Sequence, residues 1–329
     1  MFKNKKILII LPYYFGYQNQ IKNHLVQRGA DVYLINEDVN EFSFYNKFIS
    51  IYNKGLYNLI LRKYYKEKFL KIPNQLDSIL IIKGSTISEQ EILYLKNKYP
   101  KVKLIMYQWD SVTNYSKATQ VAQWCDINIT FDPIDAIENH WRYRALFFDP
   151  DMCNNKEQKS IDISYICSVH SDRVHLYNEV IKFAKKHNLI FFNYLFSNRW
   201  SFYRQKYFKK NKSFMIKSSQ LKFTPLSSKK TAKIYDKSKA VLDFKFTNQV
   251  GLTIRTIESI GHKCKLITNN KQIIKEDFYN PNNIYIYDIE NFNIPISFFQ
   301  TSYIPVSKEI YYKYSIDGWL DDVFEGVFL

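Results

Sequence analysis

Short apolar runs recur along the chain and are separated by longer segments in which apolar residues follow a helical spacing. In the first half the runs cover 7–11, 31–35, 78–82, 102–107 and 127–131. Runs of this length that are apolar on both faces are typical of buried parallel strands. Between the first two, Ile21, Leu25 and Val26 predict a helix up to Arg28, with Gly29 as its C-cap. The segment 44–70 also has a helical pattern.

The second half repeats this alternation after a polar, aliphatic-poor stretch at 149–159. Strands are predicted at 161–169, 241–244, 265–268 and 284–287, and two short helices at 307–314 and 316–324. The polar stretch is a plausible linker. The sequence therefore predicts an α/β protein with two Rossmann-like domains.

The segment 241–270 holds the densest candidate chemistry. After its first strand, Gly251 opens a helix whose apolar positions are Ile254, Ile257 and Ile260. A glycine at this turn lets the backbone approach a ligand, and the helix N-terminus offers free N–H groups to a phosphate. Glu258 lies about two turns into the helix, where its carboxylate can accept ribose hydroxyls. The alternative is an ordinary strand–helix–strand unit without a ligand.

Two blocks in this half, at 249–258 (QVGLTIRTIE) and 277–284 (DFYNPNNI), resemble motifs of GT-B glycosyltransferases. The resemblance is strongest to CgeB-like transferases of bacterial surface polysaccharide and lipopolysaccharide core. It covers most of the second half of the chain and, more weakly, the first. It implies two domains that face across a cleft: an acceptor domain at 1–155, a nucleotide-sugar domain at 160–305, and terminal helices at 306–329 that pack back on the first domain.

The same resemblance implies a donor site for a UDP-, dTDP- or GDP-linked sugar. Its expected residues are Ser168, Ser171, Arg173, Gln249, Gly251, Leu252, Thr253, Arg255 and Glu258. Val250 stands where the larger retaining families carry the first of two glutamates, so an inverting hexosyl- or deoxyhexosyltransferase is expected. Cys167 replaces a glycine of the loop that ends at Arg173.

An inverting transfer needs a base for the acceptor hydroxyl. Asp110 follows a predicted strand at the sheet edge where ligands of such folds bind, and is the first candidate; His170, after another strand, is the second. Arg173 and Arg255 would compensate the diphosphate. The sequence has no Asp-x-Asp metal motif at a strand exit, so neither a metal nor another cofactor is expected.

The formal charge is +16, and no acidic residue stands between Glu179 and Asp236, a span rich in lysine, arginine and aromatics. Such a segment suits an anionic membrane surface or a nucleic acid, or reflects composition alone. We favour the membrane, with a patch at Arg204, Lys206, Lys209, Lys210 and Lys212. Four scattered cysteines and the lack of a long apolar run predict a cytoplasmic protein, peripheral on the inner membrane face. Nucleic-acid binding and a non-catalytic scaffold are the alternative functions.

Overall fold

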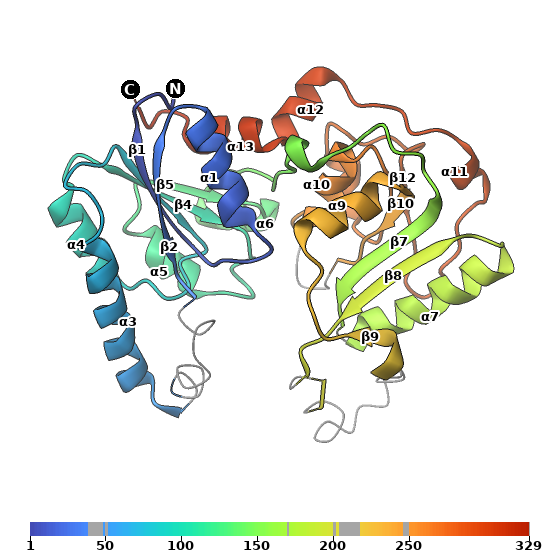
Figure 1. Ribbon diagram of the computed structural model, residues 1–329, viewed down its shortest axis with the longest axis horizontal. Coiled ribbons are helices and arrows are strands. Elements are labelled where there is room, and N and C mark those ends of the chain that lie inside the picture. The colour runs from blue at the N-terminus through green and yellow to red at the C-terminus, as the bar shows by residue number, and fades with distance from the viewer. Residues whose placement is uncertain are drawn as a thin grey trace. The chain divides into compact units, whose positions relative to one another are not determined.

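The computed structural model describes residues 1–38, 49, 52–169, 171–199, 202–203, 218–245 and 250–328. The chain forms two compact units (Figure 1). Unit 1 contains Met1–Leu146, Asn248–Gly251 and Ile316–Leu329, and unit 2 contains Phe147–Thr247 and Leu252–Ser315. Each unit is built on one six-stranded sheet in which every described pair of strands is parallel.

The sheet of unit 1 has the strand order β2-β1-β3-β4-β5-β6. The strands are β1 (Lys6–Leu11), β2 (Asp31–Asn36), β3 (Ser78–Ile82), β4 (Lys103–Gln108), β5 (Ile127–Thr130) and β6 (Arg142–Tyr143). In the central register, Ile9 of β1 pairs with Leu34 of β2 and with Leu80 of β3. The strand order reverses between β1 and β3, so the carboxyl ends of these two strands form the switch point where ligands of doubly wound sheets bind.

Helices cover both faces of this sheet: α1 (Tyr17–Gln27), α3 (Lys54–Phe69), α4 (Glu89–Lys98), α5 (Lys117–Ala122), α6 (Pro133–Asn139) and α13 (Ile316–Val323). Leu8 and Ile10 of β1 share a core with buried residues of α3, α4 and α5. On the opposite face, Trp319 of α13 packs edge-on against Tyr107 of β4, with ring centroids 4.8 Å apart. The last helix is thus part of the core of unit 1.

The sheet of unit 2 has the order β12-β11-β10-β7-β8-β9. The strands are β7 (Ile161–Ser168), β8 (Phe191–Phe196), β9 (Leu221–Lys222), β10 (Ser238–Leu242), β11 (Lys265–Thr268) and β12 (Ile284–Ile286). Here the order reverses between β7 and β10, where Ala240 pairs with Ile163. The described helices are α7 (Ser171–Lys186), α9 (Ser228–Asp236), α10 (Ile254–Gly261), α11 (Ser297–Gln300) and α12 (Lys308–Tyr314).

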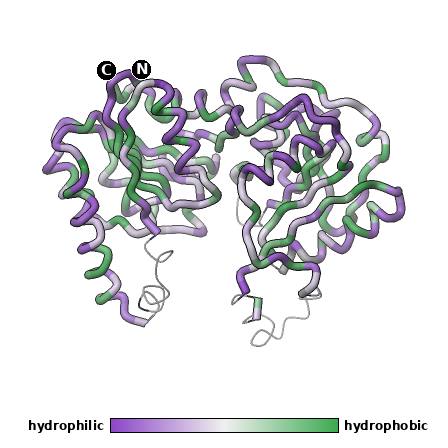
Figure 2. Tube along the Cα trace, in the orientation of Figure 1, coloured by the Kyte–Doolittle hydropathy of each residue, from purple (hydrophilic) through white to green (hydrophobic). Residues whose placement is uncertain are grey.

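Alternate residues of the unit 2 strands meet different helices. Tyr165 and Leu242 join a core with Leu176 and Val180 of α7, whereas Val241 packs with Tyr235 of α9 on the other face. Figure 2 shows hydrophobic residues gathered along the strands inside both units, while the helices alternate between hydrophobic and hydrophilic positions. This pattern is the one that the apolar runs of the sequence predict.

The predicted fold class, α/β with two Rossmann-like domains, is confirmed. One predicted strand differs from the structure by more than one residue at its limits. The strand predicted at 241–244 is β10, which begins at Ser238 and ends at Leu242, so Asp243 and Phe244 follow the strand and are not part of it. Of the helix predicted at 44–70, the structure describes α3, and 44–48 lie outside the described residues. Within the described parts of the chain, no helix combines the length and apolar character that crossing a bilayer requires.

Candidate functional site

Asp243 is the centre of a polar cluster at the switch point of unit 2. It follows β10 directly and its side chain is fully buried. One carboxylate oxygen accepts a hydrogen bond from the Thr253 hydroxyl at 2.7 Å, and the other accepts one from the Thr268 hydroxyl at 3.0 Å. Tyr287 donates its hydroxyl to the Asp243 carbonyl oxygen at 3.1 Å. Two strand ends and the entry of α10 therefore converge on one carboxylate.

Arg255 brings a buried positive charge to this carboxylate. It is the second residue of α10, and Thr253 is the N-cap whose side chain accepts from the Thr256 N–H. The Nε atom of Arg255 lies 3.6 Å from an oxygen of Asp243, and its side chain is 13% exposed. Burial alone would lower the pKa of Arg255, but the Asp243 carboxylate and neighbouring tyrosine and cysteine side chains raise it above its usual value. The guanidinium therefore stays charged.

Arg173 is a second buried guanidinium beside the first. It lies in the first turn of α7, and its Nη1 donates to the carbonyl oxygen of Ser168, the last residue of β7, at 2.9 Å. Its guanidinium carbon lies 5.8 Å from the centre of the Phe244 ring. Burial and, second, the charge of Arg255 lower the pKa of Arg173. The two guanidinium groups therefore lie close enough to repel each other.

The charge balance of this cluster indicates the class of ligand that it fits. Two largely buried arginines, Arg173 and Arg255, lie near the buried carboxylate of Asp243, whose two oxygens also accept from threonine hydroxyls. Guanidinium groups held away from water are well placed to bind an anion. The cluster lies at the carboxyl ends of β7 and β10, the strand edge where ligands bind in this architecture. A phosphate or diphosphate group meets both conditions.

The remaining described residues of the predicted donor site have different surroundings. Ser168 contributes its carbonyl oxygen to Arg173, and Leu252 is buried in the apolar interior. Glu258, in the second turn of α10, is half-buried and acts electrostatically on Tyr235 and Cys153. Ser171 is the first residue of α7. Gln249 and His170 lie outside the described residues.

Gly251 belongs to unit 1 and packs against other residues of that unit. Its N–H donates to an Asp132 carboxylate oxygen at 2.8 Å, and the N–H of Val250 donates to the same oxygen at 3.0 Å. A Cβ at position 251 would lie 2.6 Å from a ring carbon of Phe131 and 2.8 Å from its carbonyl oxygen. Packing against Phe131 therefore requires glycine here, whereas the sequence attributes it to the approach of a ligand. Contact of Gly251 with a donor stays a prediction.

Asp110 lies in unit 1, after β4. Its carboxylate forms an ion pair with Lys83 at 2.8 Å, and its side chain is 42% exposed. Lys83 follows β3, and its ammonium lies 5.9 Å from the ring centre of Tyr14 and 5.8 Å from that of Tyr115. The role of Asp110 as a base stays a prediction.

Sequence reasoning missed Asp243, Thr268 and Tyr287. Asp243 had a usable signal, because it is the first polar residue after an apolar strand, but the predicted strand ended two residues too late and included it. Thr268 and Tyr287 are ordinary strand residues in the sequence. Only the parallel register of β10, β11 and β12 places their hydroxyl groups beside Asp243.

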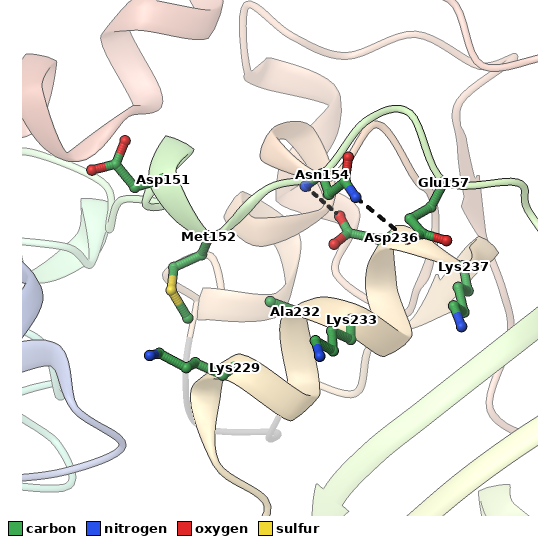
Figure 3. A pocket seen from close by; sticks show the side chains of 9 residues that line it. All are labelled: Asp151, Met152, Asn154, Glu157, Lys229, Ala232, Lys233, Asp236 and Lys237. Carbon is green, nitrogen blue, oxygen red and sulfur yellow. Dashed lines mark hydrogen bonds between the residues drawn. The ribbon is translucent and has the colours of Figure 1, made fainter.

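A separate pocket of about 360 Å³ lies between α9 and the segment before β7 in unit 2 (Figure 3). Asp236 anchors it by accepting hydrogen bonds from the Asn154 N–H at 2.9 Å and from His262 at 2.7 Å. Its lining mixes both signs of charge: Asp151, Met152, Asn154, Glu157, Lys229, Ala232, Lys233, Asp236 and Lys237. None of the described residues of the predicted site lines it. Its mixed lining gives no preference for an anionic ligand.

No protein-family model matches this sequence, and no curated protein is similar to it. Solved structures of similar fold include the UDP-GlcNAc 2-epimerase of Methanocaldococcus jannaschii, with 11% identity, a TM-score of 0.48, and 86% of this chain and 89% of that chain covered. MurG of Acinetobacter baumannii has 10% identity and a TM-score of 0.45, over 90% and 89%. The Escherichia coli heptosyltransferase WaaC has 8% identity and a TM-score of 0.36, over 80% and 86%. Likeness at this level does not extend to activity.

Proposed function

We propose that this protein is a glycosyltransferase that moves a hexosyl or deoxyhexosyl group from a nucleotide-sugar donor to a bacterial surface glycan. The observation that carries the proposal is the pair of largely buried arginines, Arg173 and Arg255, at the switch point of unit 2, where Arg255 lies beside the carboxylate of Asp243. The motif resemblance at 249–258 supports the same assignment, because Arg255 belongs to that motif.

The donor diphosphate would lie against Arg173 and Arg255. When the bond between the sugar and the diphosphate breaks, negative charge grows on the leaving oxygen, and two fixed guanidinium groups stabilise that charge. The groups are held in place before the reaction by Ser168 and Asp243, so little reorganisation is needed. Transfer would be inverting and independent of metal ions, with UDP, dTDP or GDP as the leaving group.

The acceptor would be a lipid-linked glycan of lipopolysaccharide core, O-antigen or capsule, reached from the cytoplasmic face of the membrane. This part rests on the motif resemblance and on the excess of basic residues. Proton removal from the acceptor hydroxyl requires a base, for which the sequence offers Asp110 and His170.

Thermal unfolding with UDP, dTDP and GDP tests the donor site. A nucleotide present at a concentration of 100 times its Kd should stabilise the folded protein by about 2.7 kcal/mol. Arg255→Ala and Arg173→Ala should abolish this stabilisation. Lys182→Ala, which removes an exposed charge on α7, should retain it. Equal nucleotide stabilisation of all four proteins would place the donor site elsewhere, and no stabilisation of the wild type would remove the proposal.

A further inference from the structure

The helix α3 of unit 1 has apolar residues on two sides, and only one of these sides faces the core. Its buried residues are Leu61, Tyr65 and Phe69, and the last two belong to the core that contains β1. Leu56 and Leu59 are instead 41% and 59% exposed. Leu56 precedes Tyr65 by about two and a half helical turns, so these two side chains point to opposite sides of the helix. The core therefore does not use the two leucines.

The side of α3 that faces away from the core, here called the outward side, is a continuous line of exposed residues. Its members follow one another at alternating intervals of three and four residues: Leu56, Leu59, Lys63, Lys66 and Leu70. Such spacing keeps side chains on one side of an α-helix. In Figure 1 the first turns of α3 extend beyond the strand ends of unit 1, and Figure 2 shows that they include hydrophobic positions. These turns contain no buried residue.

The basic residues on and beside the outward side have no anionic partner in the part of the chain that the structure describes. Arg62, Lys63 and Lys66 are exposed, and no described hydrogen bond or ion pair involves their side chains. The only acidic residue of α3 is Glu67, against five basic ones. Uncompensated positive charge beside exposed leucines is complementary to a surface that is negatively charged and has an apolar layer beneath its charges.

Other occupants fit this side less well. A second copy of the chain would bring the same patch of both copies together, which sets Lys63 and Lys66 against like charges. A nucleic acid would satisfy the basic residues, but its bases are bound by stacking on aromatic side chains, and the exposed apolar residues here are leucines. An anionic lipid bilayer uses both kinds of side chain.

We propose that the outward side of α3 docks on an anionic phospholipid surface, with Leu56 and Leu59 between the headgroups. Arg62, Lys63 and Lys66 then contact lipid phosphates. Inserted apolar side chains and basic side chains near anionic lipid both favour attachment. Stable attachment takes more than one such element, so this surface adds to the patch predicted at 204–212 and does not replace it. The surface belongs to unit 1 alone and requires neither a bound donor nor sugar transfer, so the inference goes beyond the proposed function.

Sedimentation with vesicles tests the surface in the full-length protein. The vesicles contain phosphatidylcholine alone or equal parts of phosphatidylcholine and phosphatidylglycerol. The double variant Leu56→Asn, Leu59→Asn should lower the partition coefficient on anionic vesicles by about tenfold or more. The triple variant Arg62→Glu, Lys63→Glu, Lys66→Glu should lower it by about 100-fold or more. The wild type should bind the neutral vesicles much more weakly than the anionic ones.

Matched controls separate this surface from general stickiness and general charge. Ile134→Asn with Ile137→Asn removes two exposed apolar residues of α6, and Lys3→Glu with Lys101→Glu and Lys103→Glu makes the same charge change at exposed sites of unit 1. Both controls should bind vesicles like the wild type. A tryptophan reports insertion directly: brominated lipid should quench the added fluorescence of Leu59→Trp and not that of Ile137→Trp.

Several outcomes would overturn the lipid surface: unchanged vesicle binding in the α3 variants, an equal loss in the controls, or equal binding of the wild type to neutral vesicles. Tighter binding of single-stranded DNA than of vesicles at equal salt would also do so. A dimer in solution that dissociates in the double leucine variant would assign the outward side to a second copy. Nucleotide stabilisation should be the same in every variant. A wild type without it would remove the proposed function and leave the lipid surface standing.

Discussion

Two buried carboxyl groups, Asp243 and Glu37, differ in the charge of the groups that surround them. Asp243 faces the guanidinium of Arg255 and accepts from two threonine hydroxyls, so its negative charge is compensated. Glu37 accepts from the neutral donors of Ser85, and burial raises its pKa to about 7. The same chemical group is therefore suited to hold a cation in unit 2 and to exchange a proton in unit 1.

Asp243→Asn should lower the free energy of unfolding by about 3–5 kcal/mol, because it leaves a buried guanidinium without its counter-charge. Thr268→Val is the matched control, since it keeps the charge pair and removes the hydroxyl that donates to the same carboxylate and accepts from the Asn270 N–H. It should cost about 1–2 kcal/mol. Urea unfolding at pH 7 measures both. If Asp243→Asn costs no more than Thr268→Val, the ion pair with Arg255 contributes nothing to stability.

Glu37 should make stability depend on pH in a defined direction. Its pKa is raised from 4.5 to about 7 by burial, so the unfolded chain releases this proton at lower pH than the folded chain. Rising pH between these values therefore favours unfolding, and the cost, about 3 kcal/mol, is complete above pH 7. Compared with the wild type, Glu37→Gln should gain this amount between pH 4 and 8 in urea unfolding. The exposed Glu67→Gln on α3 is the control and should show no such gain.

At the scale of elements, apolar periodicity predicted most of the fold and only part of the site. Strands such as β1 and β3 are visible in the sequence because they are apolar on both faces. The arginines were predictable because Arg255 stands in a motif and Arg173 follows closely on an apolar strand. The partners of Asp243 and Glu37 were not, because Ser85 lies 48 positions from Glu37 and Thr268 lies 25 positions from Asp243. Only the strand order brings such pairs together.

Gly261 at the end of α10 offers a test of helix packing. A Cβ there would lie 2.6 Å from Cγ of Phe148 and 3.0 Å from Sγ of Cys153. Gly261→Ala should therefore lower the free energy of unfolding by about 1–3 kcal/mol through overpacking, despite the better helix propensity of alanine. Gly55→Ala on α3 is the control, because its Cβ would meet nothing nearer than 3.6 Å. It should be neutral or stabilising by up to about 1 kcal/mol. Equal melting temperatures of the two variants would contradict the predicted overpacking.

At the scale of the whole molecule, the formal net charge is +16, and the two arginines of the cluster account for only a small part of it. Exposed lysines of the acid-free span, such as Lys182 and Lys185 on α7 and Lys229 on α9, add to it within the described residues. The predicted patch at 204–212 lies outside those residues, so its role stays a prediction. A high net charge attracts any polyanion, whichever basic residues carry it. A membrane-binding patch instead depends on particular basic residues beside aromatic ones.

Charge reversal at Arg204, Lys206, Lys209, Lys210 and Lys212 distinguishes a membrane patch from general positive charge. The wild type should sediment with vesicles containing anionic lipid and not with neutral ones, since each basic residue near the surface contributes about 1 kcal/mol. The reversed protein should stay in solution, with nucleotide binding unchanged. A control with Lys182, Lys185, Lys186, Lys229 and Lys230 reversed carries the same charge change at exposed sites and should still sediment. Equal release of both variants indicates net charge alone, and tighter binding of single-stranded nucleic acid than of vesicles at equal salt contradicts the membrane role.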